Sequence, residues 1–416
     1  MPAPDGKPML WPTASAVTAK APDGRPSSAT RYGFVDAAGD VAAPPRYASY
    51  AYCGDSEGRP ALVLASDADG SDLLDLTGRK VTRVEARHAE CAGTDHLIVA
   101  AGAGEGAVAA ATGEVVLAAA SDQQVAAVIG SVVNVSLPSG EHFLDLATGV
   151  EAPHVGWVTV AAQEAGAPGV PAAARRSSTG KPAGRLGYVG RSGEWLLGPQ
   201  FDAASAFRGG YAVVERDGRA TFLDAGLRRV GGEWDEIRPI TEPAAIGERV
   251  LGYWVEADGR RGLLGPDLEP VVQPGPGQID CEPDAAGACS VIAPDGAADL
   301  VQLPAGGAVT LPDGFTRAIT AGLAADRPAA GEPTRIRSLA SGRTLTLAGG
   351  AACRGVGPGF ALCPNAVIDA DGDTAAFTSV TAVPGPSGGT AYYWVTTARE
   401  QGFLDLDGRW RFRERR

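Results

Sequence analysis

The chain has 416 residues, a mass of 42.2 kDa and a net charge of −13, from 36 basic and 49 acidic residues. At roughly 100 to 200 residues per domain, it has room for two or three domains or one large repeat fold. An acidic surface repels phosphate backbones, which argues against nucleic acid as a partner. No apolar run approaches the roughly 20 residues of a membrane helix, and Met1–Asp5 lack the basic and apolar segments of a signal peptide. We therefore expect a soluble protein with no membrane span.

Residues 1–30 are rich in proline, serine and alanine. They are expected to form an N-terminal arm, or a partial repeat, because Gly6–Pro12 resembles the second half of the unit described below. Residues 31–416 have almost no helical pattern, since glycine or proline interrupts most windows of twelve residues. Short apolar runs between turn residues dominate instead, which predicts an all-β chain.

One unit recurs along residues 31–416: a four-residue strand that usually ends in aspartate, a glycine-containing turn and a second short strand. The copies start on average about 37 residues apart. Five of them begin with glycine, roughly every second one, so the period is either one unit or a pair of units. The copies are Gly33–Asp36, Asp72–Asp75, Gly106–Ala109, His142–Asp145, Gly187–Gly190, Thr221–Asp224, Gly262–Gly265, Asp299–Gln302, Ile336–Leu339, Ala366–Asp369 and Gly402–Asp405.

The best-preserved stretch shows what one unit contains. Gly187–Gly190 and Trp195–Leu197 are predicted strands separated by a glycine turn, and an aromatic-aspartate pair, Phe201-Asp202, follows them. The alternating strand Tyr211–Glu215 then leads into Asp217-Gly218, a strong hairpin signal because glycine accepts the positive φ of such turns. One unit can thus hold four short antiparallel strands.

This order of glycine, aromatic residue, glycine turn, aromatic-aspartate pair and alternating strand resembles the bacterial WG-repeat family, also called KWG repeats. The resemblance extends from about Gly33 onward and is clearest over residues 187–224. Tyr32, Leu186 and Gln401 stand where the family has the tryptophan of its Trp-Gly pair. The resemblance implies a repetitive β architecture and no defined catalytic activity.

We therefore predict an all-β fold: an array of about eleven units of short antiparallel strands over residues 31–416, closing into a propeller-like ring. Six paired units are one arrangement of such a ring, and an open β-solenoid is the alternative fold. Residues 161–181 are low in apolar bulk and are predicted to form an inserted loop. At the C-terminus, basic residues alternate with Trp410 and Phe412, which predicts a strand with one charged face. That face is either a solvated edge or a docking strip for an acidic partner.

The six cysteines occupy related positions in the units. Cys53, Cys91, Cys281 and Cys353 all fall where the best-preserved unit has Phe207. Two more lie on the following strand, where a hairpin return places Cys289 opposite Cys281 and Cys363 opposite Cys353. We predict these two bonds and a third, between neighbouring units, that joins Cys53 to Cys91. Such pairing indicates an oxidising compartment, extracellular or at the cell surface. The alternative is six buried thiols in a cytoplasmic protein.

Motifs for catalysis, metals and cofactors are weak, and none of these three kinds of site is predicted. Ser56 and Ser387 lie in Gly-x-Ser-x-Gly sequences, which form a nucleophile elbow only between a strand and a helix and with a histidine later in the chain. Ser56 lies in a predicted hairpin loop with no helix after it, and no histidine follows Ser387. The sequence contains no Cys-x-x-Cys pair of the kind that binds zinc. Asp67–Asp72 and Asp369–Asp373 resemble the start of a calcium loop, but both lack its twelfth-position glutamate and coincide with predicted turns.

Exposed repeat surfaces bind partners through loops and strand ends, so the sequence favours a non-enzymatic interaction module. We expect it to be exported and to contact a protein partner in a larger assembly or a cell-surface glycan. The alternative is a carbohydrate-active hydrolase with paired carboxylates in a central funnel. Some tryptophans are expected to pack between sheets and others to form stacking platforms for sugars. The candidate binding residues are Trp195, Trp234, Trp254, Trp394, Arg409, Arg411 and Arg413.

Overall fold

The computed structural model consists of β-strands and connecting turns, with no helix among the residues it describes. Contacts divide the chain into two compact units, Met1–Val230 (unit 1) and Gly231–Arg416 (unit 2). Each unit is treated by itself below. The residues described are 9–20, 26–55, 59–86, 88–129, 131–153, 157–159, 169–175, 182–190, 192–281, 287–326, 332–347, 353–364, 366–385, 390–406 and 408–415.

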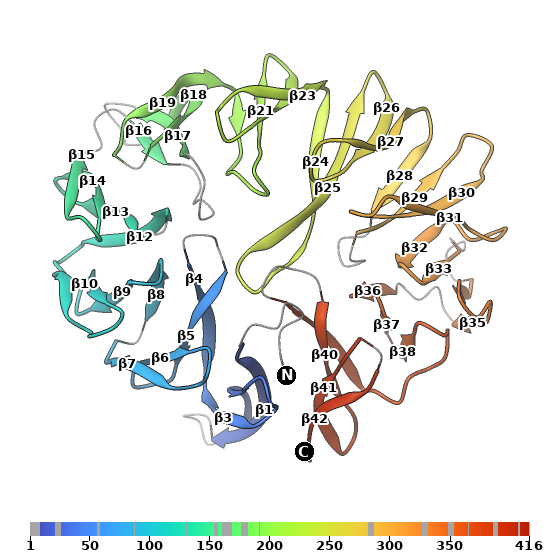
Figure 1. Ribbon diagram of the computed structural model, residues 1–416, viewed down its shortest axis with the longest axis horizontal. Helices are drawn as coiled ribbons and strands as arrows, with labels where there is room; N and C mark the ends of the chain where they lie inside the picture. The colour runs from blue at the N-terminus through green and yellow to red at the C-terminus, as the bar shows by residue number, and fades with distance from the viewer. Residues whose placement is uncertain are drawn as a thin grey trace. The chain divides into compact units, whose positions relative to one another are not determined.

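Unit 1 contains strands β1 to β22 and the start of β23 (Figure 1). Their bounds are β1 (Trp11–Lys20), β2 (Pro26–Val35), β3 (Val41–Tyr47), β4 (Ser49–Gly54), β5 (Pro60–Ser66), β6 (Ser71–Asp75), β7 (Lys80–Val84), β8 (Ala89–Ala92), β9 (His96–Ala101), β10 (Gly104–Ala109), β11 (Val115–Leu117), β12 (Gln124–Ile129), β13 (Val132–Leu137), β14 (Gly140–Asp145), β15 (Val150–Pro153), β16 (Trp157–Thr159), β17 (Val170–Arg175), β18 (Pro182–Val189), β19 (Trp195–Phe201), β20 (Ala203–Ala204), β21 (Ala212–Arg216), β22 (Arg219–Leu223) and β23 (Arg229–Trp234).

Unit 2 contains the remaining strands. They are β24 (Glu236–Pro243), β25 (Glu248–Ala257), β26 (Arg260–Leu264), β27 (Pro270–Gly275), β28 (Gln278–Cys281), β29 (Ala288–Ile292), β30 (Ala298–Gln302), β31 (Gly307–Thr310), β32 (Arg317–Thr320), β33 (Leu323–Ala325), β34 (Thr334–Ser338), β35 (Thr344–Leu347), β36 (Arg354–Val356), β37 (Phe360–Cys363), β38 (Ala366–Asp369), β39 (Ser379–Pro384), β40 (Thr390–Thr396), β41 (Glu400–Leu404) and β42 (Trp410–Arg415).

These strands form eleven small sheets, in each of which the strands lie side by side in chain order. Nine sheets have four strands, and the sheets β1–β3 and β36–β38 have three. Strands that follow one another pair antiparallel, as in a propeller blade. The prediction of an all-β, propeller-like repeat array is confirmed. Each motif copy lies on a different sheet, so the single-unit period, and not the pair, is the one observed.

The sequence repeat is out of phase with the sheets. In every four-stranded sheet the motif copy lies on the third strand, as Gly187–Gly190 does at the end of β18. A repeat that starts there supplies the last two strands of one sheet, β18 and β19, and then the first two of the next, β20 and β21. Each repeat therefore ties two neighbouring sheets together.

Glycine begins some copies for a steric reason. The register between β2 and β3 shifts at Gly33, and a Cβ there would lie 2.6 Å from the carbonyl oxygen of Ala43 on the next strand. At Gly262 the corresponding distance, to the carbonyl oxygen of Val272, is 2.8 Å. Strands β14 and β15 pair without such a shift, and that copy begins with His142. At Gly33 and Gly262 a bulge beside the third strand thus requires glycine. A bulge alone does not decide the residue, because β6 and β7 also shift register and that copy begins with Asp72.

Aspartate ends many copies because its carboxylate closes the turn to the next strand. In Asp75 one carboxylate oxygen accepts hydrogen bonds of 3.0 Å from the backbone N–H groups of both Thr77 and Arg79. Asp224 accepts equivalent bonds from Gly226 and Arg228. The turn glycine supplies the left-handed conformation, with a φ of 89° at Gly78.

All six cysteines form the predicted disulfide bonds. The Cys53–Cys91 bond joins β4 to β8 and so connects two neighbouring sheets of unit 1. The Cys281–Cys289 bond joins residues directly opposite each other on β28 and β29. The Cys353–Cys363 bond joins the ends of the β36–β37 hairpin. Since three disulfides form, the structure is suited to an oxidising environment.

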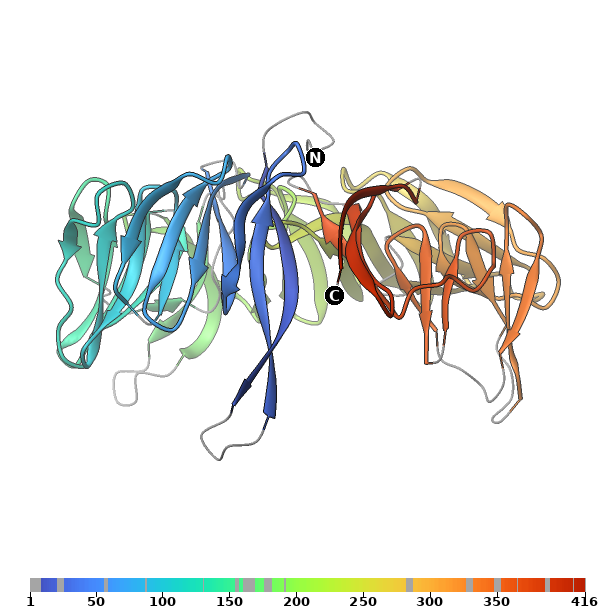
Figure 2. The same ribbon diagram turned by 90° about the horizontal axis from the view of Figure 1, so that it is seen from below.

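The two segments without a clear repeat pattern contain strands. Within residues 1–30, β1 pairs with β2 over ten residues, and this hairpin extends well beyond β3 (Figure 2). Within the predicted inserted loop, Val170–Arg175 form β17, which pairs with β16 and β18, so that part of the prediction is wrong. Residues 161–168 and 176–181, like Ser56 and Ser387, lie outside the described residues. The described part of the chain contains no helix long and apolar enough to cross a membrane.

Candidate binding surface

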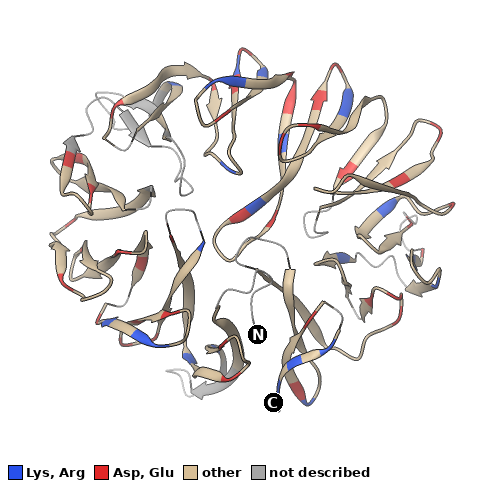
Figure 3. Ribbon diagram, in the orientation of Figure 1, with Lys and Arg blue, Asp and Glu red and all other residues tan. Residues whose placement is uncertain are grey.

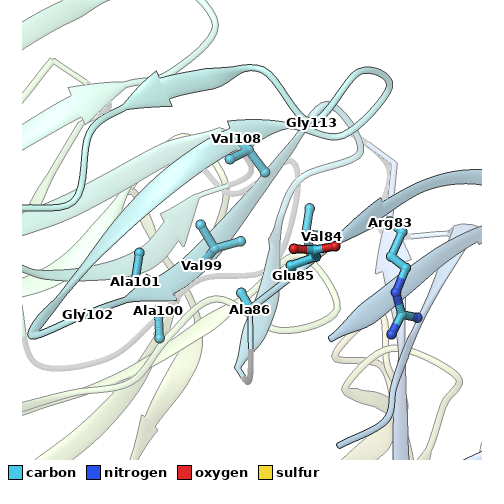
Figure 4. Close-up of a pocket in the computed structure, with 10 residues that line it drawn as sticks. All are labelled: Arg83, Val84, Glu85, Ala86, Val99, Ala100, Ala101, Gly102, Val108 and Gly113. Carbon is cyan, nitrogen blue, oxygen red and sulfur yellow. The ribbon is translucent and has the colours of Figure 1, made fainter. Parts of the chain in front are cut away.

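A groove of about 700 Å³ lies in unit 1, where β7 of one sheet faces β9 and β10 of the next (Figure 4). This volume falls within the range of small-ligand sites and has ample room for one or two side chains. Apart from two charged residues, the lining consists of small and apolar residues. The lining residues are Arg83, Val84, Glu85, Ala86, Val99, Ala100, Ala101, Gly102, Val108 and Gly113.

The floor of the groove is rigid and apolar. Val84, Val99 and Val108 are all buried and belong to the core between the two sheets, which the Cys53–Cys91 bond also joins. At one end, the space around Gly102 is open, since a Cβ there would meet no atom within 4 Å. The floor therefore offers apolar contact, and the open end leaves room for the backbone of another molecule.

The two charged residues of the groove differ in their pairing. Figure 4 shows Arg83 directed away from Val99 and Val108. Its guanidinium forms ion pairs of 3.0 Å with both Asp67 and Asp72. Glu85 is exposed and takes part in no hydrogen bond or ion pair within the described part of the chain. Among the lining residues, Glu85 therefore carries the one charge without a partner in the described part of the chain.

Arg83 is held in place by a buried carboxylate. The side chain of Asp72 is fully buried, lies 2.5 Å from the guanidinium of Arg46 and accepts a 2.9 Å hydrogen bond from the hydroxyl of Tyr47. Burial raises the pKa of Asp72, but hydrogen bonds from Arg83 and Tyr47 and the charge of Lys80 outweigh it, so its pKa is lowered. Asp72 is thus ionised at neutral pH. It joins β3, β6 and β7, the last of which is rich in basic residues (Figure 3).

The calcium-like sequences form ion pairs and turns. Between Asp67 and Asp72 the structure places the guanidinium of Arg83. Asp369 accepts hydrogen bonds from the backbone N–H groups of Asp371 and Asp373, which is the turn already seen at Asp75. Among the residues that the structure describes, no three His, Cys, Asp or Glu side chains gather closely enough to hold a metal ion.

Large apolar side chains are exposed on the last strands of the sheets of unit 1. These residues, here called the edge residues, are between 38% and 63% exposed. They lie on β3, β11, β15 and β19, each the last strand of its sheet. Val115 on β11 stands opposite the groove residue Val108 on β10, so the edge residues continue from the groove. The edge residues are Val41, Val115, Val116, Val150 and Leu196.

The four candidate tryptophans lie on four different sheets, on β19, β23, β25 and β40, and all are partly buried. Trp195 packs against the core that includes Phe143. Trp234 donates a 2.9 Å hydrogen bond to the carbonyl oxygen of Gly231. Within unit 2, the guanidinium of Arg238 covers the Trp254 ring at 4.8 Å, and Trp394 meets Phe403 edge to face at 4.9 Å. The tryptophans of unit 2 thus each contact a residue of their own sheet.

The candidate arginines lie on or just before β42. Arg411 forms a 2.7 Å ion pair with Asp405, and Arg413 pairs with Glu400 while its guanidinium covers the Trp410 ring at 5.0 Å. Arg409 is exposed. Two of the three charges are therefore partly neutralised within the sheet.

No sequence motif pointed to the groove. Its lining comes from two repeats, and the role of Glu85 depends on the pairing of Arg83 with one carboxylate from the turn before β6 and one from β6 itself. One available signal was the adjacent pair Val115-Val116 in the short strand β11, where alternation of buried and exposed residues breaks down.

Residues 187–219 match the family model of the WG containing repeat. The chain therefore carries a WG repeat. This WG repeat extends from β18 to β21 and so includes strands of two neighbouring sheets. The resemblance drawn from the sequence is confirmed at this repeat, which is the one stretch that the family model matches.

No curated protein sequence matches the chain. Solved structures similar to this chain include a eukaryotic initiation factor, with 11% identity, 98% of this chain and 96% of that chain covered, and a TM-score of 0.36. Apo AztD from Citrobacter koseri has 9% identity, coverages of 69% and 94%, and a TM-score of 0.28. The WD40 domain of SCAP from fission yeast has 7% identity, coverages of 77% and 92%, and a TM-score of 0.29.

Proposed function

We propose that this protein is a non-enzymatic interaction module, exported to the cell exterior or surface, that contacts a protein partner through unit 1. The observation that carries the proposal is the exposure of five large apolar side chains on the last strands of four sheets. Edge strands usually carry charged residues that prevent association, so apolar edges favour a partner that covers them. Val115 and Val116, beside the groove, are the centre of the proposed interface.

Export is supported by the disulfide bonds, which persist in oxidising compartments and are rare in the cytosol. Protein taken directly from its native host and treated with a thiol-alkylating reagent should take up no label before reduction and six labels after it. Labelling of the unreduced protein would place it in a reducing compartment instead.

Binding is a better fit than glycoside hydrolysis. One pair of carboxylates that lie close together, Asp67 and Asp72, shares Arg83, and both have lowered pKa values. A glycosidase needs one carboxyl with a raised pKa to donate a proton to the leaving group. This pair therefore lacks the acid that the alternative function requires.

The test is affinity purification of the tagged protein from culture supernatant and lysate of its host, followed by mass spectrometry. Wild-type protein should recover a stoichiometric partner from the supernatant. A variant with Val115→Lys, Val116→Lys and Val150→Lys should lose that partner and remain folded, because exposed substitutions change stability little.

The matched control is Val309→Lys, an exposed valine on the last strand of a sheet in unit 2. This variant should keep the partner. Equal recovery by all three proteins would place the interface elsewhere. Wild-type protein that recovers no protein but binds an immobilised cell-surface glycan would establish glycan binding instead.

A further inference from the structure

The groove beside β7 allows a statement about the chemistry of the partner. We propose that it receives a lysine or arginine side chain of the partner protein, whose cationic group pairs with Glu85. This inference rests on the proposed function, because it assigns one contact within that interface.

The charges of the groove select a cation. Glu85 pairs with no described residue, whereas Arg83 is already bound by two carboxylates, one of them fully buried. An anionic ligand would face the Glu85 carboxylate with no available cation in the lining to offset it. The net charge of −13 also attracts a basic partner over longer distances.

The apolar surface of the groove fits the rest of such a side chain. Lysine and arginine carry a charged end on an aliphatic stem, and the stem packs favourably on apolar surface while the charge stays near water. Val84, Val99 and Val108 offer that surface, and the exposed Glu85 offers a half-solvated carboxylate next to it (Figure 4). A purely apolar ligand would leave this carboxylate facing it without a counter-charge.

The position of the groove fits insertion from a neighbouring protein. Its open end at Gly102 leaves room for a backbone, and Val115 adjoins the floor through its pairing with Val108. A partner that covers the edge residues would therefore bring its own side chains over the groove. The inserted residue would anchor the partner at a fixed position along β10.

The experiment uses the intact protein with ¹³C-labelled valine methyl groups and N-acetyl-lysine methylamide as the probe. Titration should shift the methyl resonances of Val84, Val99 and Val108 in a saturable manner, with a dissociation constant on the order of 1 to 10 mM for a single side chain. The norleucine analogue keeps the aliphatic stem without the charge and should give no saturable shift.

The matched variants are Glu85→Gln and Glu215→Gln, the latter an exposed glutamate on β21, in another sheet of unit 1. The first should weaken probe binding by about fivefold to tenfold, since it removes the charge of the acceptor, and the second should not. The methyl spectrum without probe checks that both variants are folded.

Unchanged valine resonances up to about 50 mM lysine probe, far above the expected range, would overturn the inference. Binding of the lysine probe by Glu85→Gln with the affinity of the wild type would also overturn it. Neither result bears on the proposed function, because loss of a captured partner in the Val115, Val116 and Val150 variant tests that independently. If partner capture itself fails while the probe binds, the groove is a cation site without the proposed interface.

Discussion

Gly187 illustrates how a neighbouring strand determines which residue type a position can hold. The register of β18 and β19 shifts there, and a Cβ would clash with the carbonyl oxygen of Leu197. Gly187→Ala should therefore destabilise the protein by about 2 to 4 kcal/mol, because backbone and not a flexible side chain must move. Urea unfolding at neutral pH measures this change.

Gly198 provides the comparison on the same strand pair. A Cβ there meets no atom within 4 Å. Gly198→Ala should change stability by less than about 0.5 kcal/mol. If the two alanine variants unfold at the same urea concentration, close approach of β19 is not what requires glycine in the repeat.

Asp72 predicts how stability depends on pH. Its pKa is lower in the folded protein than in the unfolded chain, so its contribution is complete above the unfolded value of about 4 and is lost as pH falls through the folded value. Asp72→Asn should cost about 2 to 4 kcal/mol at pH 7, because Arg83 and Arg46 lose their shared partner. The variant should also lose less stability than wild type between about pH 5 and pH 3, the range around and just below the pKa of aspartate in the unfolded chain.

Asp69 is a suitable control because it is exposed and lies in the same turn. The free energy of unfolding of Asp69→Asn in urea should match that of wild type at pH 7 and throughout the acidic range given above. If Asp72→Asn and wild type lose the same unfolding free energy as the pH falls, other carboxylates govern the acid sensitivity.

At the scale of elements, the disulfides should differ in how much each contributes to the free energy of unfolding. The Cys53–Cys91 bond closes a loop of 38 residues between sheets, whereas Cys281–Cys289 closes one of 8 within a hairpin. Loop-closure entropy then predicts a loss of about 4 kcal/mol for the first bond and about 2.5 kcal/mol for the second when both cysteines become serine. Thermal unfolding of the two double variants measures the difference.

A reversed order would mean that hairpin strain or residual structure in the unfolded chain outweighs loop length. The variant lacking Cys53 and Cys91 also tests the groove, since this bond joins the two sheets that form it. The valine methyl resonances of the groove should broaden or shift in that variant and stay unchanged in the other.

The sequence predicted the elements well where each repeat determines its own structure. All eleven motif copies lie on strands, even the degenerate copy Ile336–Leu339, which overlaps β34. Turn chemistry and cysteine positions are local properties, and so the hairpins and disulfides could be predicted. Strand β17 was missed because its short side chains carry almost no alternating pattern, and its pairing with β18 decides its conformation.

The groove could not be predicted because its chemistry is not local. Whether Arg83 or Glu85 is available depends on which carboxylates reach Arg83, and these come from the turn before β6 and from β6 itself. The adjacent pair Val115-Val116 was a signal of an exposed strand but did not show which strand it would pair with. Only the order of strands within each sheet shows that β11 is an edge.

At the scale of the whole molecule, the border between the two units falls inside β23, after Val230. A fragment that ends at Val230 should be less stable than one that ends at Trp234, because it lacks most of the last strand of the sheet β20–β23. At about 2 to 4 °C per kcal/mol for a chain of this size, the melting temperatures should differ by several degrees. Equal melting temperatures in calorimetry would show that β23 adds little to unit 1.

The phase difference between repeat and sheet also affects how such a chain can change its length during evolution. Duplication or loss of one repeat, wherever its ends fall, joins each strand to a strand of the kind that normally follows it. The number of sheets then changes by one, and no half-sheet remains at the junction. A gene built this way can gain or lose single repeats in steps, provided that an added or lost repeat does not separate two cysteines such as Cys53 and Cys91.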